Sequence, residues 1–207
     1  TYYNMEDPVL GGYTPEKVAL RRAINLAVDV DKEVRLPRRS QAMKAQGVVP
    51  LTSFGSSPDF KTEMSEYNLP KAKALLDLYG YTDKDGDGWR DQPDGQPLVL
   101  TYNTESNAEQ RALAELWQKN MDALGVRIQF VWAKWPENLK AATAGKLQMW
   151  GFGWSAAIDD GDTFLALGSS KSAGKANKPR FNLPAFEQLY DKQKTLPDGP
   201  ERLAVML

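Results

Sequence analysis

The segment at residues 150–157, WGFGWSAA, carries the residue types best suited to holding a small organic molecule. Side chains alternate between the two faces of a strand, so Trp150, Phe152 and Trp154 would share one face and the glycines the other. A glycine within a strand often marks the close approach of a ligand or of another backbone. The pattern predicts a packed core or an aromatic binding wall. We favour the binding wall for Trp154, at the strand end.

Carboxylates are the side chains that could perform acid–base catalysis, because the chain contains neither histidine nor cysteine. Their absence excludes Ser-His triads, thiol nucleophiles and imidazole or thiolate metal ligands. Glu105 and Asp159 follow two different predicted strands and could form the acid and base of a glycoside hydrolase. Carboxylates near helix starts are more commonly solvated. We therefore keep hydrolysis as an alternative and expect no enzyme.

The acidic loop at residues 83–94, DKDGDGWRDQPD, has the spacing of a calcium-binding loop. Its oxygen ligands would come from Asp83, Asp85, Asp87, the Trp89 carbonyl, Asp91 and Asp94. The final aspartate is shorter than the usual glutamate, which predicts modest affinity. A strand is predicted to follow the loop, which excludes a paired EF-hand. The alternatives are a calcium-stiffened interaction or scaffold module and a solvated acidic turn.

The charge balance argues against nucleic acid and membrane partners. The chain has 26 basic and 27 acidic residues, a net charge of −1, so no strong field favours a polyanion. No apolar run approaches the roughly 20 residues that span a bilayer, so we expect no direct membrane insertion. The chain opens on a predicted strand and stops within an apolar predicted helix, so we expect a fragment.

The elements that must position these residues follow from hydrophobic periodicity and capping signals. Residues 106–109 have the spacing of a capping box, with Ser106 and Glu109 as its members, and Gly125 can end the helix that follows. A long loop is predicted at residues 43–69. Helices are predicted at residues 15–28, 32–39, 70–79, 106–124, 136–144 and 200–207, and strands at 1–5, 97–103, 126–132 and 147–154.

The order strand, helix, strand, helix, strand from residue 97 to residue 154 predicts three parallel strands joined by right-handed crossovers. Sheets of this kind bind ligands beyond the carboxyl ends of their strands. That rule selects three loops that should open on one edge of the sheet. They contain Thr104 and Glu105, Lys134 and Trp135, and Trp154 and Ser155.

Several motifs, taken in order, resemble the family 5 extracellular solute-binding proteins of the dipeptide, oligopeptide and nickel-binding type. A Tyr-Asn pair at residues 3–4 is followed by KVALRRAINLAVD at residues 17–29. LPKAKALL at residues 69–76 is closed by Gly-Tyr at residues 80–81. GWSA at residues 153–156 precedes DTFL at residues 162–165, and FNLPAF follows at residues 181–186. The resemblance covers nearly the whole chain.

This resemblance implies an α/β fold: a type II periplasmic-binding-protein-like lobe with a mixed sheet that contains βαβαβ parallel strands flanked by helices. Residues 1–207 would form a single domain, the second lobe of a two-lobe protein whose first lobe is absent from the chain. Such proteins capture a small ligand, peptide-like or another organic solute, between two lobes. They deliver it to the permease subunits of an ABC importer, in the periplasm or another extracytoplasmic space.

The resemblance also shows where this chain departs from peptide-binding members. Ala157 occupies the position of an aspartate that holds the peptide's amino terminus in oligopeptide-binding members. Arginines of those members match Ala142 and Gly151 here, whereas their cleft tryptophan matches Trp135. The charged anchors for a zwitterionic peptide are missing from this lobe, unless Asp159 or Asp160 substitutes for them. A larger, less charged or aromatic-stacking ligand is the alternative.

We expect Trp135 and Trp154 to form aromatic walls, the backbone and hydroxyl groups of residues 155–157 to donate or accept hydrogen bonds, and two aspartates to lie at the rim. The expected ligand-binding residues are Trp154, Ser155, Ala156, Ala157, Trp135, Asp159, Asp160, Thr104 and Glu105. We expect that no cofactor is required, and the bound ion that the sequence suggests is a structural calcium ion.

Overall fold

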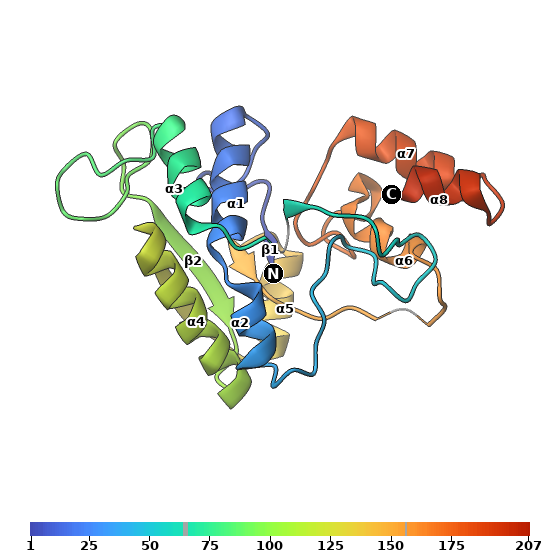
Figure 1. The fold of residues 1–207 in the computed structure, drawn as a ribbon, viewed down its shortest axis with the longest axis horizontal. Coiled ribbons are helices and arrows are strands. Elements are labelled where there is room, and N and C mark those ends of the chain that lie inside the picture. The colour runs from blue at the N-terminus through green and yellow to red at the C-terminus, as the bar shows by residue number, and fades with distance from the viewer. Residues whose placement is uncertain (64–65, 156) are drawn as a thin grey trace.

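The computed structural model describes residues 1–63, 66–155 and 157–207, which include a four-stranded mixed sheet. The sheet and helices α1–α5 make up one half of the molecule (Figure 1). The strand order is β1-β4-β2-β3. Strands β2, β3 and β4 run parallel, and β1 pairs antiparallel with β4. The strands are β1 Tyr2–Tyr3, β2 Val99–Thr104, β3 Arg127–Trp132 and β4 Met149–Trp150. The predicted α/β class and the three parallel strands are confirmed.

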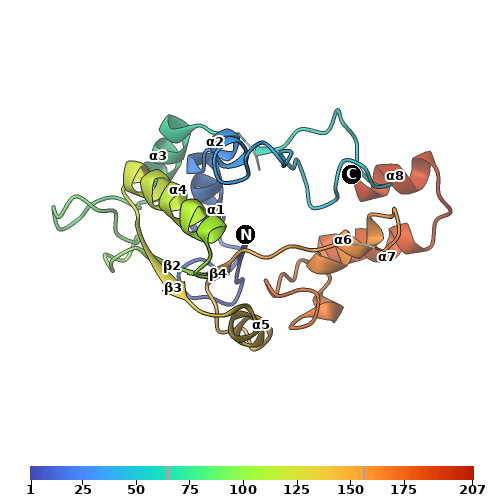
Figure 2. The ribbon, with the colours of Figure 1, turned by 90° about the horizontal axis from the view of Figure 1, so that it is seen from below.

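Two crossover helices lie on opposite faces of the sheet. Helix α4 (Ala108–Leu124) joins β2 to β3, and α5 (Trp135–Thr143) carries the chain from β3 back past β2 to β4. Figure 2 shows α4 above the sheet and α5 below it. The connection therefore reverses direction at β2, which makes the carboxyl end of β2 the switch point of the sheet.

The main core lies between the sheet and three helices on one face. Helix α1 (Pro15–Ala27) packs against α3 (Leu69–Leu78), and both contact α4. Apolar side chains recur at helical spacing on the inner face of each helix, so one continuous core forms. Its fully buried members include Leu20, Ile24, Leu76, Tyr81, Leu98, Leu100, Met121 and Leu124.

The start of α4 differs from the prediction, whereas its end agrees. Asn107 is the N-cap, and its side chain accepts a hydrogen bond from the Gln110 backbone N–H at 2.9 Å. The predicted capping box of Ser106 and Glu109 is therefore wrong. The Glu109 carboxylate instead accepts from Arg38 at 2.8 Å. Gly125 ends the helix with a φ of 81°, a left-handed conformation that glycine adopts without strain.

The strand predicted at residues 147–154 is shorter in the structure. Strand β4 ends at Trp150, opposite Asn103 of β2 on one side and Tyr2 of β1 on the other. Strand β2 stops one residue later, at Thr104. Phe152 and Trp154 therefore lie in a segment without strand pairing, outside the sheet.

Helix α2 (Val30–Arg35) begins and ends earlier than predicted. Leu36 still donates its N–H to the Lys32 carbonyl at 2.9 Å, but Pro37 has no N–H to continue the helical hydrogen bonds, so the helix ends at Arg35. Among the residues that the structure describes between α2 and α3, no α-helix and no sheet strand follows, across most of the predicted long loop. This segment reaches the C-terminal helices, since the Phe54 N–H donates to the Asp159 carbonyl at 3.4 Å.

The C-terminal helices form a separate group beside the sheet (Figures 1 and 2). Leu165, Tyr190 and Met206 make a small apolar cluster of their own between these helices. Among the described helices, none is both long and apolar enough to cross a membrane. The helices are α6 Asp162–Leu165, η2 Ala166–Gly168, η3 Ser170–Ser172, α7 Pro184–Lys194 and α8 Pro200–Met206.

Candidate functional site

The carboxyl edge of the parallel strands brings together two of the three predicted loops. Glu105 follows β2 directly, Trp135 begins α5 three residues after β3 ends, and Trp150 ends β4. Because the two crossover helices lie on opposite faces, a crevice is expected at the end of β2. The third loop, with Trp154 and Ser155, starts from the same edge and leads away from the sheet.

A buried polar network holds this edge together. The Glu105 carboxylate accepts hydrogen bonds from Trp150 Nε1 at 3.1 Å and from Asn138 Nδ2 at 3.0 Å. Asn138, on α5, is 1% exposed, and its Oδ1 accepts from Asn103 Nδ2 at 3.2 Å. A buried network in which each member has a partner fixes a single arrangement of its side chains. The network therefore orients the Trp150 indole and ties α5 to the end of β2.

A chain of aromatic contacts runs outward from this network, and we call Trp135, Trp150, Phe152 and Trp154 the aromatic ladder. Ring centroids lie 6.4 Å apart for Trp135 and Trp150, 5.0 Å for Trp150 and Phe152, and 6.1 Å for Phe152 and Trp154. Trp150 is fully buried, whereas Trp135 is 52% exposed and Trp154 is 43% exposed. The ladder thus has an anchored centre and two exposed indoles, a surface on which a flat or apolar group can stack.

The glycines of the ladder segment differ in their surroundings. A Cβ atom at Gly151 would lie 2.7 Å from the Tyr102 hydroxyl oxygen, closer than side chains tolerate. A Cβ atom at Gly153 would meet nothing within 4 Å. Close approach therefore explains Gly151, and its neighbour is a side chain of the protein itself. Gly153 has no such constraint.

Some of the other predicted ligand-binding residues are exposed, whereas others are bonded to groups of the protein itself. Ser155, Ala157 and Asp159 are exposed, whereas Ala156 lies outside the described residues. Thr104 is 2% exposed, and its hydroxyl donates to Gln110 Oε1 at 3.1 Å. Its side chain is therefore directed into the protein, where it can position the end of β2 without touching a ligand.

Asp160 is held by an arginine from the last helix. Arg202 Nη1 lies 2.8 Å from Asp160 Oδ2, and Nη2 lies 3.1 Å from Oδ1. These hydrogen bonds hold the pKa of the Asp160 carboxyl below its usual value. Arg202 also bonds Gln193 and Asp198, and its guanidinium lies 5.3 Å from the Phe54 ring centroid. Asp160 therefore has a structural role: its ion pair with Arg202 holds α8 against the segment that follows the ladder.

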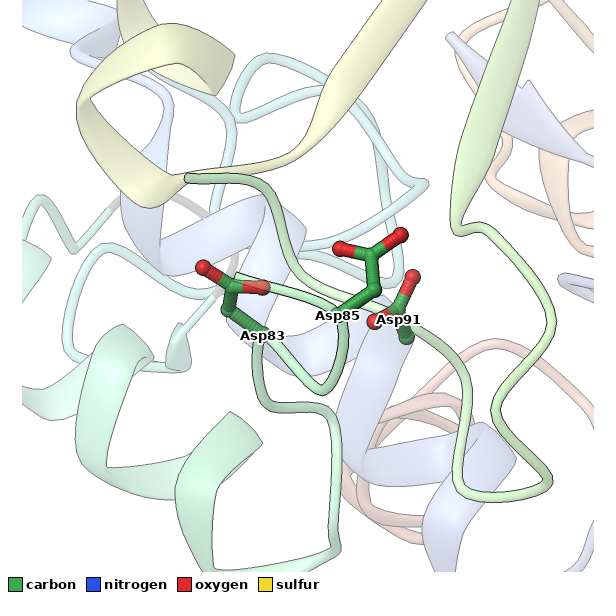
Figure 3. Close-up of side chains that lie close together, drawn as sticks. All are labelled: Asp83, Asp85 and Asp91. Carbon is green, nitrogen blue, oxygen red and sulfur yellow. The ribbon is translucent and has the colours of Figure 1, made fainter. Parts of the chain in front are cut away.

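Three of the predicted calcium ligands converge. Carboxylate oxygens of Asp83, Asp85 and Asp91 lie within 4.8 Å of one another, and Figure 3 shows the three side chains gathered over the loop. Asp91 is 2% exposed and accepts from the Lys84 N–H at 2.9 Å. Asp83 accepts from the Gly86 and Gly88 N–H groups at 2.7 and 2.9 Å.

The remaining calcium-loop residues have other partners. Asp87 accepts from the Trp89 backbone N–H, which lowers the pKa of its carboxyl, and it forms an ion pair with Arg127. The Arg127 guanidinium lies 5.7 Å from the Trp89 ring centroid. Asp94 accepts from the Gln96 N–H at 3.0 Å. Three carboxylates are fewer than the six to eight oxygens that calcium takes, so water and carbonyl groups would have to complete a site.

Sequence reasoning missed the residues that position the site. Asn138 and Ala142 share the inner face of α5, four residues apart, and both are buried. An amide on the inward face of an otherwise apolar helix is a signal for a buried hydrogen-bond network. The partner of Asp160 left no comparable signal, because Arg202 lies 42 residues further along the chain.

We expect Glu105→Leu to destabilise the fold by about 1–3 kcal/mol, because it leaves the buried Trp150 indole without its acceptor and Asn138 Nδ2 with only the Thr104 carbonyl at 3.3 Å. Glu105→Gln is the matched control. Both hydrogen bonds end on Oε1, which an amide oxygen can replace, so this variant should lose far less. Urea denaturation of the two variants and the parent gives the free energies of unfolding. Equal losses in both variants would contradict the network.

The glycoside hydrolase alternative gains no support from this geometry. Glu105 is engaged by an indole and an amide, and the exposed Asp159 joins the long loop through its backbone carbonyl. Neither residue has the environment expected of a catalytic acid held in a substrate cleft.

The fold and its edge define a class of protein: the type II periplasmic binding proteins. The structure superimposes on the ABC transporter-associated periplasmic binding protein DppA from Helicobacter pylori, solved in complex with the peptide STSA. The TM-score is 0.83 at 28% sequence identity, over 100% of this chain and 37% of that one. The model of the bacterial extracellular solute-binding proteins, family 5 (middle region), matches residues 2–176. The chain belongs to this family.

Curated relatives agree with this assignment. Heme-binding protein A of Haemophilus influenzae is 30% identical over 190 residues, which cover 90% of this chain and 32% of that protein. The dipeptide-binding protein of Escherichia coli is 27% identical over 190 residues, 91% of this chain and 34% of that protein. The chain thus spans about a third of the length of these relatives.

Proposed function

We propose that this chain is one lobe of the solute-binding component of an ABC importer, and that it holds a small organic ligand against the aromatic ladder. Family membership supports the class, and the ladder is the observation that carries the site. Of its two exposed indoles, Trp135 stands at the carboxyl edge of the sheet, where α/β proteins bind ligands, and Trp154 lies on the segment that leads away from this edge. The bacterial extracellular family assigns the protein to the periplasm or another extracytoplasmic space.

A lobe of this kind works by sharing its ligand with a second lobe. A ligand that contacts both lobes binds the closed form more tightly than the open form and shifts the population toward closure. The permease subunits of the importer then recognise the closed shape. In this account the anchored centre of the ladder matters as much as its exposed ends, because a preorganised wall loses little entropy on binding.

We propose that this lobe favours a flat or weakly charged solute over a free zwitterionic peptide. Ala157 is exposed and carries no charge that could hold a peptide amino terminus. An arginine at position 151 would place its Cβ atom 2.7 Å from the Tyr102 hydroxyl, so that position has no room for one. Ala142 is fully buried. A relative named for heme binding and the two exposed tryptophans support a stacking ligand.

Calorimetry on the complete protein tests this proposal, with hemin as the flat probe and alanyl-alanine as the zwitterionic peptide. We expect hemin to bind at least about tenfold more tightly, a difference of about 1.4 kcal/mol. Tighter binding of the dipeptide would refute the ligand class while leaving the transport function intact. If neither probe binds, and mass spectrometry finds no small molecule released from the purified protein by denaturation, the transport proposal fails.

We also propose that calcium binds weakly to the loop at residues 83–94 and stiffens it. The three converging carboxylates support this proposal. Asp87 and Asp94 already bond to other groups of the protein, which argues for a low calcium affinity, with a Kd on the order of 0.1–1 mM as in extracellular modules. Calcium at about ten times that Kd should raise the unfolding free energy by about 1.4 kcal/mol. Differential scanning fluorimetry with calcium, magnesium and a chelator measures the shift, and Asp85→Asn should abolish it. A melting temperature that ignores calcium would contradict the proposal.

A further inference from the structure

A cavity of about 660 Å³ lies between β1, the outer half of the aromatic ladder and the C-terminal helices. Phe152 and Trp154 line it from the ladder, and Leu165 and Phe186 line it from helices α6 and α7. The volume falls in the range of small-molecule sites, which is about 300–1,000 Å³. Such sites combine a mostly apolar lining with a few well-placed polar groups, and the lining of this cavity has both features.

The apolar part of the lining consists largely of aromatic rings. Tyr2, Phe152 and Trp154 contact one another edge to face in series, with ring centroids 5.9 and 6.1 Å apart. From the C-terminal part of the chain, Phe181 and Phe186 line the same cavity, with ring centroids 5.6 Å apart. Rings from two distant segments therefore meet at this cavity, and a flat apolar group can stack on either set.

Arg21, on α1, is the one charged residue among the described residues that line the cavity. Its Nη1 atom donates to the Leu10 carbonyl at 2.5 Å, whereas Nε and Nη2 have no hydrogen-bond partner in the described part of the chain. Among the described side chains that are not exposed, Asn120 Nδ2 is the one nitrogen or oxygen atom that is both buried and without a partner. The two free nitrogens of Arg21 are therefore accessible to water, and a polar group in the cavity can reach them.

The charge of Arg21 has no counter-ion within the described ranges, whereas its neighbour Arg22 forms an ion pair with Glu63 at 2.7 Å. The Arg21 side chain is half-buried, and burial lowers the pKa of its guanidinium, an effect that the phenols of Tyr13 and Tyr3 oppose. Both of these tyrosines also line the cavity. A partly buried charge without a partner is unfavourable, so an anion in the cavity would stabilise this arginine.

We propose that this cavity binds a flat aromatic carboxylate, with the rings of the ligand beside Trp154 and its carboxylate bonded to Arg21. The Nε and Nη2 atoms lie on one edge of a guanidinium group, where they form a fork that matches the two oxygens of a carboxylate. Charge-assisted hydrogen bonds of this kind are about twice as strong as neutral ones. The cavity shares Phe152 and Trp154 with the ladder, so this proposal rests on the proposed function and adds the charge of the ligand.

Three pyrene probes test the charge of the ligand on the complete protein without any substitution. 1-Pyrenebutyrate, 1-pyrenebutanol and 1-pyrenebutylamine carry the same flat body with a negative, a neutral and a positive end group. Titrations followed by the fluorescence anisotropy of pyrene give the three dissociation constants. We expect the acid to bind at least about tenfold more tightly than the alcohol, and the amine to bind most weakly.

Arg21→Met should bring the affinities for the acid and the alcohol to within about twofold of each other, because the charge-assisted hydrogen bonds are gone. Arg22→Met is the matched control. Arg22 carries the same charge one residue further along α1, but it is exposed and bonded to Glu63, so the preference for the acid should be unchanged. Arg21→Met also removes the donor to the Leu10 carbonyl. Should it fail to fold, Arg21→Gln takes its place, because glutamine keeps an amide donor and lacks the charge.

The outcomes separate this proposal from the proposed function. Equal binding of the acid and the alcohol, with both weakened by Trp154→Ala, would overturn the role of Arg21 and leave the ladder intact. The proposal also fails if the Arg21 variants keep the preference for the acid, or if the amine binds as tightly as the acid. If none of the three probes binds, another part of the complete protein covers the cavity and the proposal is wrong, whereas the hemin titration still tests the proposed function.

Discussion

Replacing Trp154 with alanine should weaken ligand binding to the complete protein by about tenfold or more. The indole is 43% exposed at the outer end of the aromatic ladder, and Phe152 supports it edge-on at 6.1 Å between ring centroids. Aromatic residues at binding centres commonly contribute about 2 kcal/mol or more. Because Trp154 lies outside the sheet, its loss should cost little folding stability. Calorimetry with the solute that the parent protein binds gives the ratio of affinities.

Trp89→Ala is the matched control for this experiment. Trp89 lies in the loop that precedes β2, at the amino end of the parallel strands, and its recorded ring partner is Arg127. This variant loses the same side chain at the edge of the sheet away from the proposed site, so its affinity should equal that of the parent. If Trp154→Ala binds as tightly as Trp89→Ala, Trp154 does not belong to the site.

The second large effect concerns Arg202, which fastens α8 to the segment after the ladder. Its side chain is 8% exposed and holds the Asp160 carboxylate with two nitrogens. Arg202→Met keeps most of the volume but leaves Asp160 uncompensated, and breaking such a pair costs about 3 kcal/mol. We expect hydrogen exchange at the amides of α8 to accelerate by about a hundredfold. Lys171→Met removes an ion pair with Asp191 in which the Lys171 side chain is 65% exposed, and it should change exchange less than about fivefold.

The contribution of the Arg202 pair should depend on pH in a defined direction. Arg202 lowers the pKa of Asp160 in the folded protein, so the stabilisation is complete above the unfolded pKa of about 3.9. It is lost as the pH falls through the lower folded value, because protonation then removes the charge. The difference in exchange between the parent and Arg202→Met should therefore be constant near neutral pH and shrink in acid. A difference that grows in acid would contradict the assignment.

Local patterns were sufficient to predict much of the fold. The alternation of Val126, Ile128, Phe130 and Trp132 and the helical stripe of Leu113, Trp117 and Met121 depend on near neighbours in sequence, so periodicity finds them. The parallel order and the carboxyl edge then follow from the handedness of crossovers. Trp135 was placed correctly at this edge for that reason.

The remainder depended on contacts between distant residues. The end of β4 at Trp150 lies beside the end of β2, which no feature of residues 147–154 reveals. Asp160 was predicted to lie at the rim of the ligand site. Nothing near it in the sequence indicates that Arg202, 42 residues further along, forms an ion pair with it. Ser106 and Asn107 are both residue types that commonly cap helices, and choosing between them shifts the start of α4 by one residue. Such choices are made by packing, which a single sequence does not display.

The most direct measurement is a crystal structure of the complete protein with its solute bound. The account predicts that a ring or apolar group of the solute lies within about 4 Å of the Trp154 or Trp135 indole. A solute bound elsewhere, with both indoles still open to solvent, would contradict the aromatic ladder as the binding wall.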